Sequence, residues 1–424
     1  MKVVMVNKSD IQGGAARAAY RLHTGLRTIG VDSRMVVDDK ISDDPSIYGS
    51  EGKINKLWSK VRPFIDGLPL KFYDWQKTSF HPARIGRNIV RDELVKQADI
   101  INLHWIAGGL LSIKGISRLA QLGKPIVWTL HDMWAFTGGC HYSVDCEKYI
   151  DSCGSCPQLN SNKDNDITRR IWRRKKRAYK NLDLTIVTPS KWLAECAKRS
   201  SLFLNLEVQV IPHGLNTGTF KPIDKLTARS ILNLPENKKI ILFGAMGVTT
   251  NRLKGFQYLK EAISKLKKMK VVNKDELCFV IFGASHSKDI EKIPFEARFL
   301  GRLHDDFSLA LTYSAADVLV GPSLQEAFGQ IYSESMSCRT PCVAFDYGGP
   351  KDIIDHKING YLAEYKNSKS LAGGIKWILE DENRAFKLGE SARKKAVETY
   401  SLETQAKKYT KLYEELLVNK SRNQ

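Results

Sequence analysis

The sequence has no long hydrophobic run, no internal repeat and no low-complexity tract. No apolar stretch approaches the roughly 18 residues that a helix needs to cross a bilayer, so a transmembrane protein is not expected. The chain starts Met-Lys-Val-Val-Met-Val-Asn and soon reaches a Gly-Gly pair, which predicts a first strand and not a signal peptide. We therefore expect a cytoplasmic protein.

Acidic residues are also comparatively few. The chain carries 46 Asp and Glu against 66 Lys and Arg, a formal net charge of +20. Nucleic acid, an anionic membrane surface and anionic substrates are all adequate partners for such a charge. A lysine-rich surface that merely keeps the protein soluble is the plainer alternative.

The 424 residues are more than one core usually organises, so two domains are expected. Short β-rich segments alternate with helical ones, which indicates parallel sheets covered by helices on both faces. The Gly- and Pro-rich segment 212–222 is predicted to be the hinge. The predicted strands are 3–6, 34–37, 99–104, 126–131, 184–188 and 208–211 before the hinge, and 239–244, 278–283, 298–301, 317–321 and 341–345 after it.

The most informative segment is 322–341, which reads Pro-Ser-Leu-Gln-Glu-Ala-Phe-Gly-Gln-Ile-Tyr-Ser-Glu-Ser-Met-Ser-Cys-Arg-Thr-Pro. Glu326 precedes a predicted turn at Gly329, and Glu334 lies on the predicted helix that follows. A strand, a tight turn and a helix N-terminus favour anion binding, because free N–H groups and the helix dipole converge there. Carboxylates beside them can accept hydrogen bonds from sugar hydroxyls, so the segment predicts a sugar-nucleotide pocket.

This segment resembles the donor-site signature of glycosyltransferase family 4, which comprises retaining enzymes of GT-B architecture. Pro-Ser, Ala-Phe-Gly, Glu-Ser-Met, the Pro-Cys-Val-Ala-Phe strand and Gly348-Gly349 occur in the family's order. The resemblance extends over nearly the whole chain, through Gly-Gly-Ala-Ala-Arg-Ala-Ala near the start, Ile-Pro-His-Gly-Leu-Asn at the hinge and Gly-Arg-Leu at 301–303.

The resemblance implies an α/β fold of the GT-B class, with two Rossmann-like, doubly wound domains facing each other across a cleft. Residues 1–213 would be the acceptor-side domain, with a Cys-rich insert at 138–160. Residues 214–400 would bind the nucleotide sugar, and a final helix at 401–424 would cross back to the N-terminal domain.

Glycosyl transfer builds negative charge on a departing diphosphate, and nearby cations can stabilise it without a metal. The family places an Arg and a Lys-Gly pair next to the diphosphate, which implies Lys254 as the catalytic cation and Arg252 as a donor contact. Many members also carry an Arg directly after the preceding strand, but this chain reads Gly-Ala-Met-Gly at 244–247. Either Arg252 replaces it or one cation fewer holds the phosphate; solvated surface cations are the alternative for both residues.

The family's pattern also assigns roles to other residues of the donor site. Glu326 would bind hydroxyls of the transferred sugar and Glu334 those of the ribose, although a first-turn helical Glu needs no ligand. Phe328 and Gly329 would offer backbone N–H groups to the phosphates. Gly14 would let the backbone approach the diphosphate from the other domain.

His131 ends a predicted strand, at the sheet edge where open α/β sheets bind ligands. The family often has a His here, which implies contact with a sugar hydroxyl or orientation of the acceptor; a structural histidine is the alternative. His104 and Trp105 would line the same cleft. No covalent nucleophile is evident, which leaves front-face displacement, with the departing phosphate taking the acceptor proton.

Four of the eight cysteines fall close together, and their spacing ends in Cys-x-x-Cys. In a reducing cytoplasm Cys140, Cys146, Cys153 and Cys156 are candidates for a structural tetrathiolate Zn²⁺ site. The wider gaps are unusual for zinc, so packing cysteines and paired thiols remain alternatives. A similar insert occurs in one branch of the family, involved in surface polysaccharide assembly.

Two segments, 53–77 and 167–182, mix basic and aromatic residues, as interfacial segments on anionic membranes do. A lipid-linked acceptor would fit this pattern, and a solvated charged face is the alternative.

We therefore expect a metal-independent, retaining glycosyltransferase, cytoplasmic or peripheral at the inner face of the plasma membrane. It would move a sugar from a nucleotide-sugar donor to a hydroxyl of a glycan or lipid-linked glycan during synthesis of a bacterial surface polysaccharide. An epimerase or phosphorylase of similar fold is the enzymatic alternative. A nucleic-acid-binding protein with a Cys₄ zinc module is the non-enzymatic one, and it leaves the donor motif unexplained.

Overall fold

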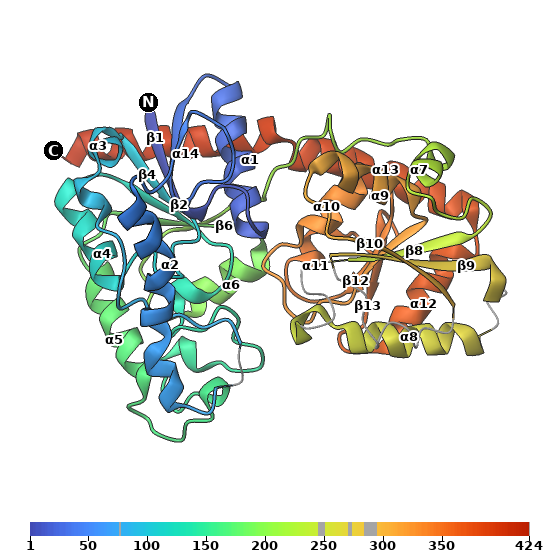
Figure 1. Cartoon of the computed structure of the whole chain (residues 1–424), viewed down its shortest axis with the longest axis horizontal. Helices are drawn as coiled ribbons and strands as arrows, with labels where there is room; N and C mark the ends of the chain where they lie inside the picture. The colour runs from blue at the N-terminus through green and yellow to red at the C-terminus, as the bar shows by residue number, and fades with distance from the viewer. Residues whose placement is uncertain (76–77, 245–250, 270–273, 284–294, 424) are drawn as a thin grey trace. The chain divides into compact units, whose positions relative to one another are not determined.

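The computed structural model describes residues 1–75, 78–244, 251–269, 274–283 and 295–423, and it divides into two units (Figure 1). Unit 1 comprises Met1–His213 and Gln405–Gln424, and unit 2 comprises Gly214–Thr404. Each unit is built on one parallel β-sheet with helices packed against it.

The sheet of unit 1 has the strand order β3-β2-β1-β4-β5-β6-β7. Its strands are β1 Lys2–Ser9, β2 Asp32–Asp39, β3 Ile47–Tyr48, β4 Ile100–Leu103, β5 Ile126–Thr129, β6 Leu184–Thr188 and β7 Val208–Val210. The helices are α1 Gly14–Thr28, α2 Lys53–Gly67, α3 Glu93–Gln97, α4 Ile113–Arg118, α5 Ile167–Tyr179, α6 Lys191–Arg199 and α14 Leu402–Asn423, whose first residues belong to unit 2. Short 3₁₀ helices are η1 Leu68–Phe72, η2 Ile89–Arg91, η3 Leu119–Leu122, η4 Trp134–Phe136, η5 Lys148–Ile150 and η6 Pro157–Leu159.

The sheet of unit 2 has the order β10-β9-β8-β11-β12-β13. Its strands are β8 Lys239–Gly244, β9 Leu277–Phe282, β10 Glu296–Gly301, β11 Val318–Gly321, β12 Cys342–Phe345 and β13 Gly360–Ala363. The helices are α7 Lys225–Ile231, α8 Phe256–Lys268, α9 Asp306–Ala315, α10 Gln330–Ser337, α11 Pro350–Ile353, α12 Ser368–Leu379 and α13 Glu382–Tyr400, with 3₁₀ turns η7 Arg252–Lys254 and η8 Lys274–Glu276.

Both sheets are doubly wound around a point where the strand order reverses. In unit 1 this point lies between β1 and β4, and in unit 2 between β8 and β11. Open α/β sheets bind ligands beyond the carboxyl ends of the strands at such a point. A ligand is therefore expected to bind beside the loops after β1 and β4 in unit 1, and beside the loop after β11 in unit 2.

The predicted α/β class with two parallel sheets is confirmed, and each predicted strand overlaps an observed one. Two edge strands, β3 and β13, are not among the predicted ones. β3 is only two residues long, and β13 begins with a glycine, so neither produces an apolar run that stands out in the sequence.

Several helices begin at a side chain that satisfies an otherwise unpaired backbone N–H group. These N-cap residues include Asp166, Ser190, Asp224, Asp305, Asn367 and Asp381. None of the helices in the described part of the chain is both long and apolar enough to cross a bilayer.

Helix α14, red in Figure 1, packs against the sheet of unit 1 and completes its core. It buries Tyr409 and Tyr413 completely. The Asn102 amide on β4 donates to the Tyr413 hydroxyl at 2.7 Å, and the Thr129 hydroxyl on β5 lies 2.9 Å from that of Tyr409. These two contacts fix the register of α14 on the sheet.

Candidate functional site

In unit 2, the segment after β11 passes through Gly329 into α10. Gly329 has φ 98°, and a Cβ there would lie 2.5 Å from Cδ2 of Tyr332. Gly349, in a neighbouring loop, is equally restricted, because a Cβ would lie 2.5 Å from Cα of Phe328. The Gly349 N–H donates to the Glu326 carbonyl at 2.8 Å. These glycines allow two loops and the start of α10 to pack closely at the carboxyl edge of the sheet.

Lys254 and Glu326 meet beside this turn. Lys254 Nζ lies 2.7 Å from Glu326 Oε2, and the two side chains are 22% and 20% exposed. The backbone holds them together, since the Leu324 N–H donates to the Leu253 carbonyl at 2.8 Å. Gly255 has φ 68°, and a Cβ there would lie 1.8 Å from the Pro322 carbonyl oxygen. The structure thus brings together two candidates that are 72 residues apart in sequence.

Glu334, on α10, is 4% exposed, and its Oε2 accepts a hydrogen bond from the Tyr313 hydroxyl at 2.8 Å. Sequence reasoning missed Tyr313, because α9 reads as an ordinary apolar helix and nothing nearby marks that hydroxyl as a partner for Glu334. Phe328 is buried and packs edge-on against Tyr400, with ring centroids 5.7 Å apart.

Arg252 lies in η7 and is exposed to solvent. The stretch without the family's usual Arg, 244–247, lies outside the described residues after Gly244. Lys254, Glu326, Phe328 and Gly329 lie in adjoining loops, and Glu334 is on the helix that these loops lead into. A cation, two carboxylates and a helix N-terminus in this arrangement can bind an anion and hydroxyl groups together.

In unit 1, Gly14 is the first residue of α1, directly after Gly13, which has φ 97°. The loop that precedes them is fixed by Asp10, which sequence reasoning did not single out. Its carboxylate accepts the backbone N–H groups of Ile11 at 2.9 Å, Ile41 at 3.0 Å and Ser42 at 2.7 Å. Gly14 therefore lies at the carboxyl end of β1, beside the switch point.

Three histidines lie together at the ends of β4, β5 and β7. His104 Nδ1 lies 3.0 Å from His131 Nε2, and the rings of His131 and His213 stack with centroids 4.9 Å apart. Burial lowers the pKa of His131 to about 4, although Asp132 acts in the opposite direction. Burial and the neighbouring imidazoles also hold the pKa of His104 and His213 well below 6.5. All three rings are therefore neutral at neutral pH, and His131 can exchange hydrogen bonds with a hydroxyl.

A second polar chain, which sequence reasoning missed, starts from Asp132. Asp132 Oδ2 accepts from Trp105 Nε1 at 2.9 Å and lies 2.6 Å from His141 Nδ1. His141 Nε2 in turn lies 2.7 Å from His81 Nδ1. Burial raises the pKa of the Asp132 carboxyl, but His141 and the hydrogen bonds around the carboxylate lower it by more. Trp105, which was predicted to line the cleft, thus donates a hydrogen bond to Asp132, and His141 and His81 extend this chain of polar contacts.

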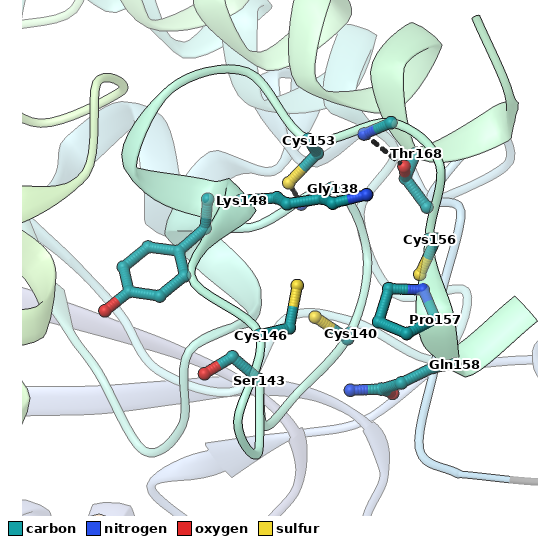
Figure 2. Close-up of a pocket in the computed structure, with 12 residues that line it drawn as sticks. Gly138, Cys140, Ser143, Cys146, Lys148, Cys153, Cys156, Pro157, Gln158 and Thr168 are labelled. Atoms are coloured by element: carbon teal, nitrogen blue, oxygen red, sulfur yellow. Dashed lines mark hydrogen bonds between the residues drawn. The ribbon is translucent and has the colours of Figure 1, made fainter. Parts of the chain in front are cut away.

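The four clustered cysteines line one pocket (Figure 2). The Gly138 N–H donates to Cys153 Sγ at 3.1 Å, and burial raises the pKa of the Cys153 and Cys156 thiols to about 12 and about 11. Across the described ranges of the chain, no group of three or more His, Cys, Asp or Glu side chains is arranged to hold a metal ion. Zinc ligation by Cys140, Cys146, Cys153 and Cys156 therefore stays a prediction.

Lys175, on α5, lies beside this pocket and is fully buried. The sequence predicted that the basic residues of this segment form a solvated or membrane-facing surface, so the burial of Lys175 was not expected. Its ammonium donates to the Thr137 carbonyl at 3.1 Å and to the Trp134 carbonyl, and lies 3.8 Å from the Trp134 ring centroid. Burial lowers its pKa to about 7, with the Cys140 and Cys153 thiols acting in the opposite direction. Lys175 thus joins the cysteine pocket to the loop that follows His131.

Two family models match the chain, one on each side of the hinge. The model described as Glycosyltransferase Family 4 matches residues 12–219. The model described as Glycosyl transferases group 1 matches residues 224–395. Together the two matches include every strand of both sheets except β1, which ends before residue 12.

Curated relatives are similar over part of the chain. An uncharacterized glycosyltransferase of Methanocaldococcus jannaschii is 31% identical over 241 residues, which are 54% of this chain and 59% of the relative. A D-inositol 3-phosphate glycosyltransferase of Corynebacterium jeikeium is 29% identical over 337 residues, 75% of this chain and 72% of the relative. The match thus spans less than two thirds of the archaeal relative's length.

Solved structures are similar over almost the full length. Sucrose-phosphate synthase from Thermosynechococcus elongatus has a TM-score of 0.68 at 19% identity and covers 99% of this chain and 100% of its own. HepE of Anabaena, in complex with UDP-glucose, has a TM-score of 0.65 at 15% identity, with coverage of 98% and 100%. At such identities the likeness concerns the fold.

Proposed function

Because the chain belongs to the glycosyltransferases, with a family 4 N-terminal half and a group 1 C-terminal half, we propose that it is a retaining sugar transferase. Its fold is the GT-B fold. The proposed donor is a nucleotide sugar, bound by residues 214–400. The proposed acceptor is a hydroxyl of a glycan or lipid-linked glycan on the side of residues 1–213, in the synthesis of a bacterial surface polysaccharide.

The observation that carries this proposal is the pairing of Lys254 with Glu326 beside the N-terminus of α10. The ammonium and carboxylate lie 2.7 Å apart at the carboxyl edge of a doubly wound sheet. A nucleotide sugar presents a diphosphate next to a sugar ring that carries hydroxyls. The Lys254 ammonium can pair with the diphosphate, and the Glu326 carboxylate can accept hydrogen bonds from the hydroxyls. The ion pair keeps both side chains in position before the donor arrives.

In the proposed reaction the bond between the anomeric carbon and the donor phosphate breaks while the acceptor oxygen approaches the same face. Lys254 and Arg252 would stabilise the charge that develops on the diphosphate, with the backbone N–H groups at Phe328 and Gly329. The departing phosphate oxygen would take the acceptor proton, so no covalent intermediate on the protein is needed. Lys254 and the helix N-terminus supply positive charge, and catalysis is proposed to need no metal.

The other candidates have binding roles in this proposal. Glu326 would hydrogen-bond hydroxyls of the transferred sugar, and Glu334, held by Tyr313, those of the ribose. His131, neutral at neutral pH, would contact a hydroxyl of the sugar or acceptor. Gly14 would allow the backbone after β1 to approach the diphosphate. Zinc in the cysteine cluster would be structural and would take no part in the transfer.

A thermal-shift screen against nucleoside diphosphates and nucleotide sugars tests the donor pocket. We expect one base family to raise the melting temperature, and the Glu334→Ala variant to lose that rise. The matched control is Glu364→Ala, at an exposed glutamate of the same unit. A screen in which no nucleotide stabilises the protein, while single-stranded nucleic acid does, would contradict the proposal.

The stereochemistry is tested separately, once the donor is known. Proton NMR of the product formed early in the reaction should show the anomeric configuration of the donor. An inverted product would exclude the retaining mechanism, and a product without transfer to a second molecule would point to an epimerase.

A further inference from the structure

Helix α2 buries polar side chains and exposes apolar ones, which is the reverse of an ordinary surface helix. Arg62 and Asp66 face inward and are 3% and 1% exposed. Arg62 Nη2 lies 2.7 Å from Asp38 Oδ2. The Asp66 carboxylate accepts three successive backbone N–H groups, from residues 83–85. Turning the apolar side of α2 inward would break the Arg62–Asp38 ion pair and the three hydrogen bonds to Asp66.

The outward side of α2 and η1 forms an apolar stripe. Its residues follow one another at intervals of mostly three or four, which places them on one helical face. Ile54, Phe64 and Phe72 are 83%, 78% and 88% exposed. The complete stripe is Ile54, Leu57, Trp58, Val61, Phe64, Leu68 and Phe72. A contiguous apolar surface of this kind marks an interaction site, since soluble proteins rarely leave one uncovered.

Cations surround the stripe. Lys53, Lys56, Lys60 and Lys71 are all exposed, and the one carboxylate within α2, that of Asp66, is buried. Beyond Phe72 the surface continues into a groove that also borders α5. The groove is lined by Arg84, Lys163, Arg170 and Arg174, together with the carboxylates of Asp74 and Asp166. Asp166 is already used, because it accepts N–H groups of the first turn of α5. The surface next to the stripe is therefore predominantly positive.

We propose that the apolar stripe is a docking surface for a bilayer that contains anionic phospholipids. Its side chains would enter the boundary between head groups and acyl chains, while the flanking lysines and the basic groove contact lipid phosphates. This proposal is independent of the sugar transfer proposed above, because it concerns a face of unit 1 and needs no donor.

The chemistry of the stripe favours a membrane over other occupants. A second copy of the chain, docked through the same face, would bring its lysines against those of the first copy. A polynucleotide would satisfy the lysines but would leave aliphatic side chains such as Ile54, Leu57 and Leu68 without apolar partners. An anionic bilayer presents an apolar acyl layer directly beneath negatively charged phosphates. One helix that lies in this interface can therefore contact both.

The test is co-sedimentation of the purified protein with vesicles, without nucleotide sugar. Vesicles of phosphatidylcholine and phosphatidylglycerol in equal amounts should bind the protein, and pure phosphatidylcholine vesicles should bind it much less. Phe64→Ser with Phe72→Ser should weaken binding at least tenfold. The matched control is Phe307→Ser with Phe386→Ser in unit 2, at phenylalanines that are 61% and 67% exposed.

Charge is tested in the same assay. Lys56→Gln with Lys60→Gln should weaken binding to the anionic vesicles by about fivefold for each lysine. The matched control, Lys267→Gln with Lys268→Gln on α8, should bind like the unaltered protein. Unchanged melting temperatures show that the variants are folded.

Three outcomes would overturn the proposal. The first is that the protein does not sediment with anionic vesicles, or that the stripe variants and their controls bind equally. The second is a dimer, seen by sedimentation velocity, that the Phe64 and Phe72 substitutions abolish. The third is tight binding to single-stranded DNA that the same substitutions abolish. Normal transfer to a soluble acceptor alongside any of these would leave the proposed function intact.

Discussion

Replacing His23 with glutamine should remove a defined part of the acid sensitivity of unit 1. His23 lies on α1 and is fully buried. Its Nδ1 lies 2.8 Å from the Ser33 hydroxyl oxygen, and its Nε2 lies 2.8 Å from that of Ser46. Burial lowers the pKa of His23 to about 4, with Asp44 opposing the shift and Arg27 adding to it. The folded protein therefore keeps this ring neutral where the unfolded chain would protonate it.

The magnitude follows from linkage. The folded pKa is lower than the unfolded pKa of 6.5, so the stabilising contribution is present above pH 6.5 and is lost as the pH falls toward 4. At 1.36 kcal/mol for each pKa unit, the full loss is about 3.4 kcal/mol. About 2 kcal/mol of it develops between pH 7 and pH 5. Glutamine can keep one donor and one acceptor for the two serines and does not titrate.

The assay is urea unfolding of the wild type and His23→Gln at pH 7, 6 and 5. Tryptophan fluorescence reports mainly on unit 1, since Trp377 is the one tryptophan of the sequence that falls in unit 2. We expect the stability of the wild type relative to the variant to fall by about 2 kcal/mol from pH 7 to pH 5. A difference that stays constant over this range would refute the reasoning, because His23 would then titrate alike in both states.

Three further outcomes are expected. Lys254→Ala and Glu326→Ala should each lower kcat by about 10²-fold or more with little change in melting temperature, measured as turnover of the donor that the thermal-shift screen identifies; normal turnover in both would exclude the proposed donor site. Gly255→Ala should destabilise unit 2 by more than about 3 kcal/mol in a circular-dichroism melt, because its Cβ would collide with the Pro322 carbonyl; an unchanged melt would show that the two loops are not packed as described. If the cysteine cluster binds zinc, chelation under reducing conditions should release it, as followed by metal analysis, and should lower the melting temperature; a metal-free protein of unchanged stability would exclude zinc from the cluster.

The sheets and the turn at Gly329 could be predicted from the sequence because their signals are local. The strand before Gly329 is a continuous apolar run, and the glycine marks a turn that only a residue without Cβ tolerates. The position of Lys254 followed from the family resemblance. Its contact with Glu326 depends on the packing of two loops around Gly255, which no local pattern reveals.

Other parts of the site depend on tertiary contacts between distant residues. His81 and His141 lie 60 residues apart, and neither carries a local sign that the other is its partner. The basic and aromatic residues of α2 were visible in the sequence, but not which side of the helix faces inward. That choice is made by the ion pair between Arg62 and Asp38 and by the N–H groups around Asp66. The burial of Lys175 could not be predicted for the same reason, because in the sequence it is one of several consecutive basic residues.

The packing of α14 on the sheet of unit 1 has a consequence for how the chain is made. During translation the strands of unit 1 leave the ribosome first, but the helix that fills their core follows only after Gly214–Thr404. At about 5–20 residues per second, synthesis of that intervening stretch takes roughly 10–40 s. Throughout this interval the surface that receives Tyr409 and Tyr413 is open. The nascent first unit is thus a natural client for chaperones that shield apolar surface, while the second unit can fold as soon as it emerges.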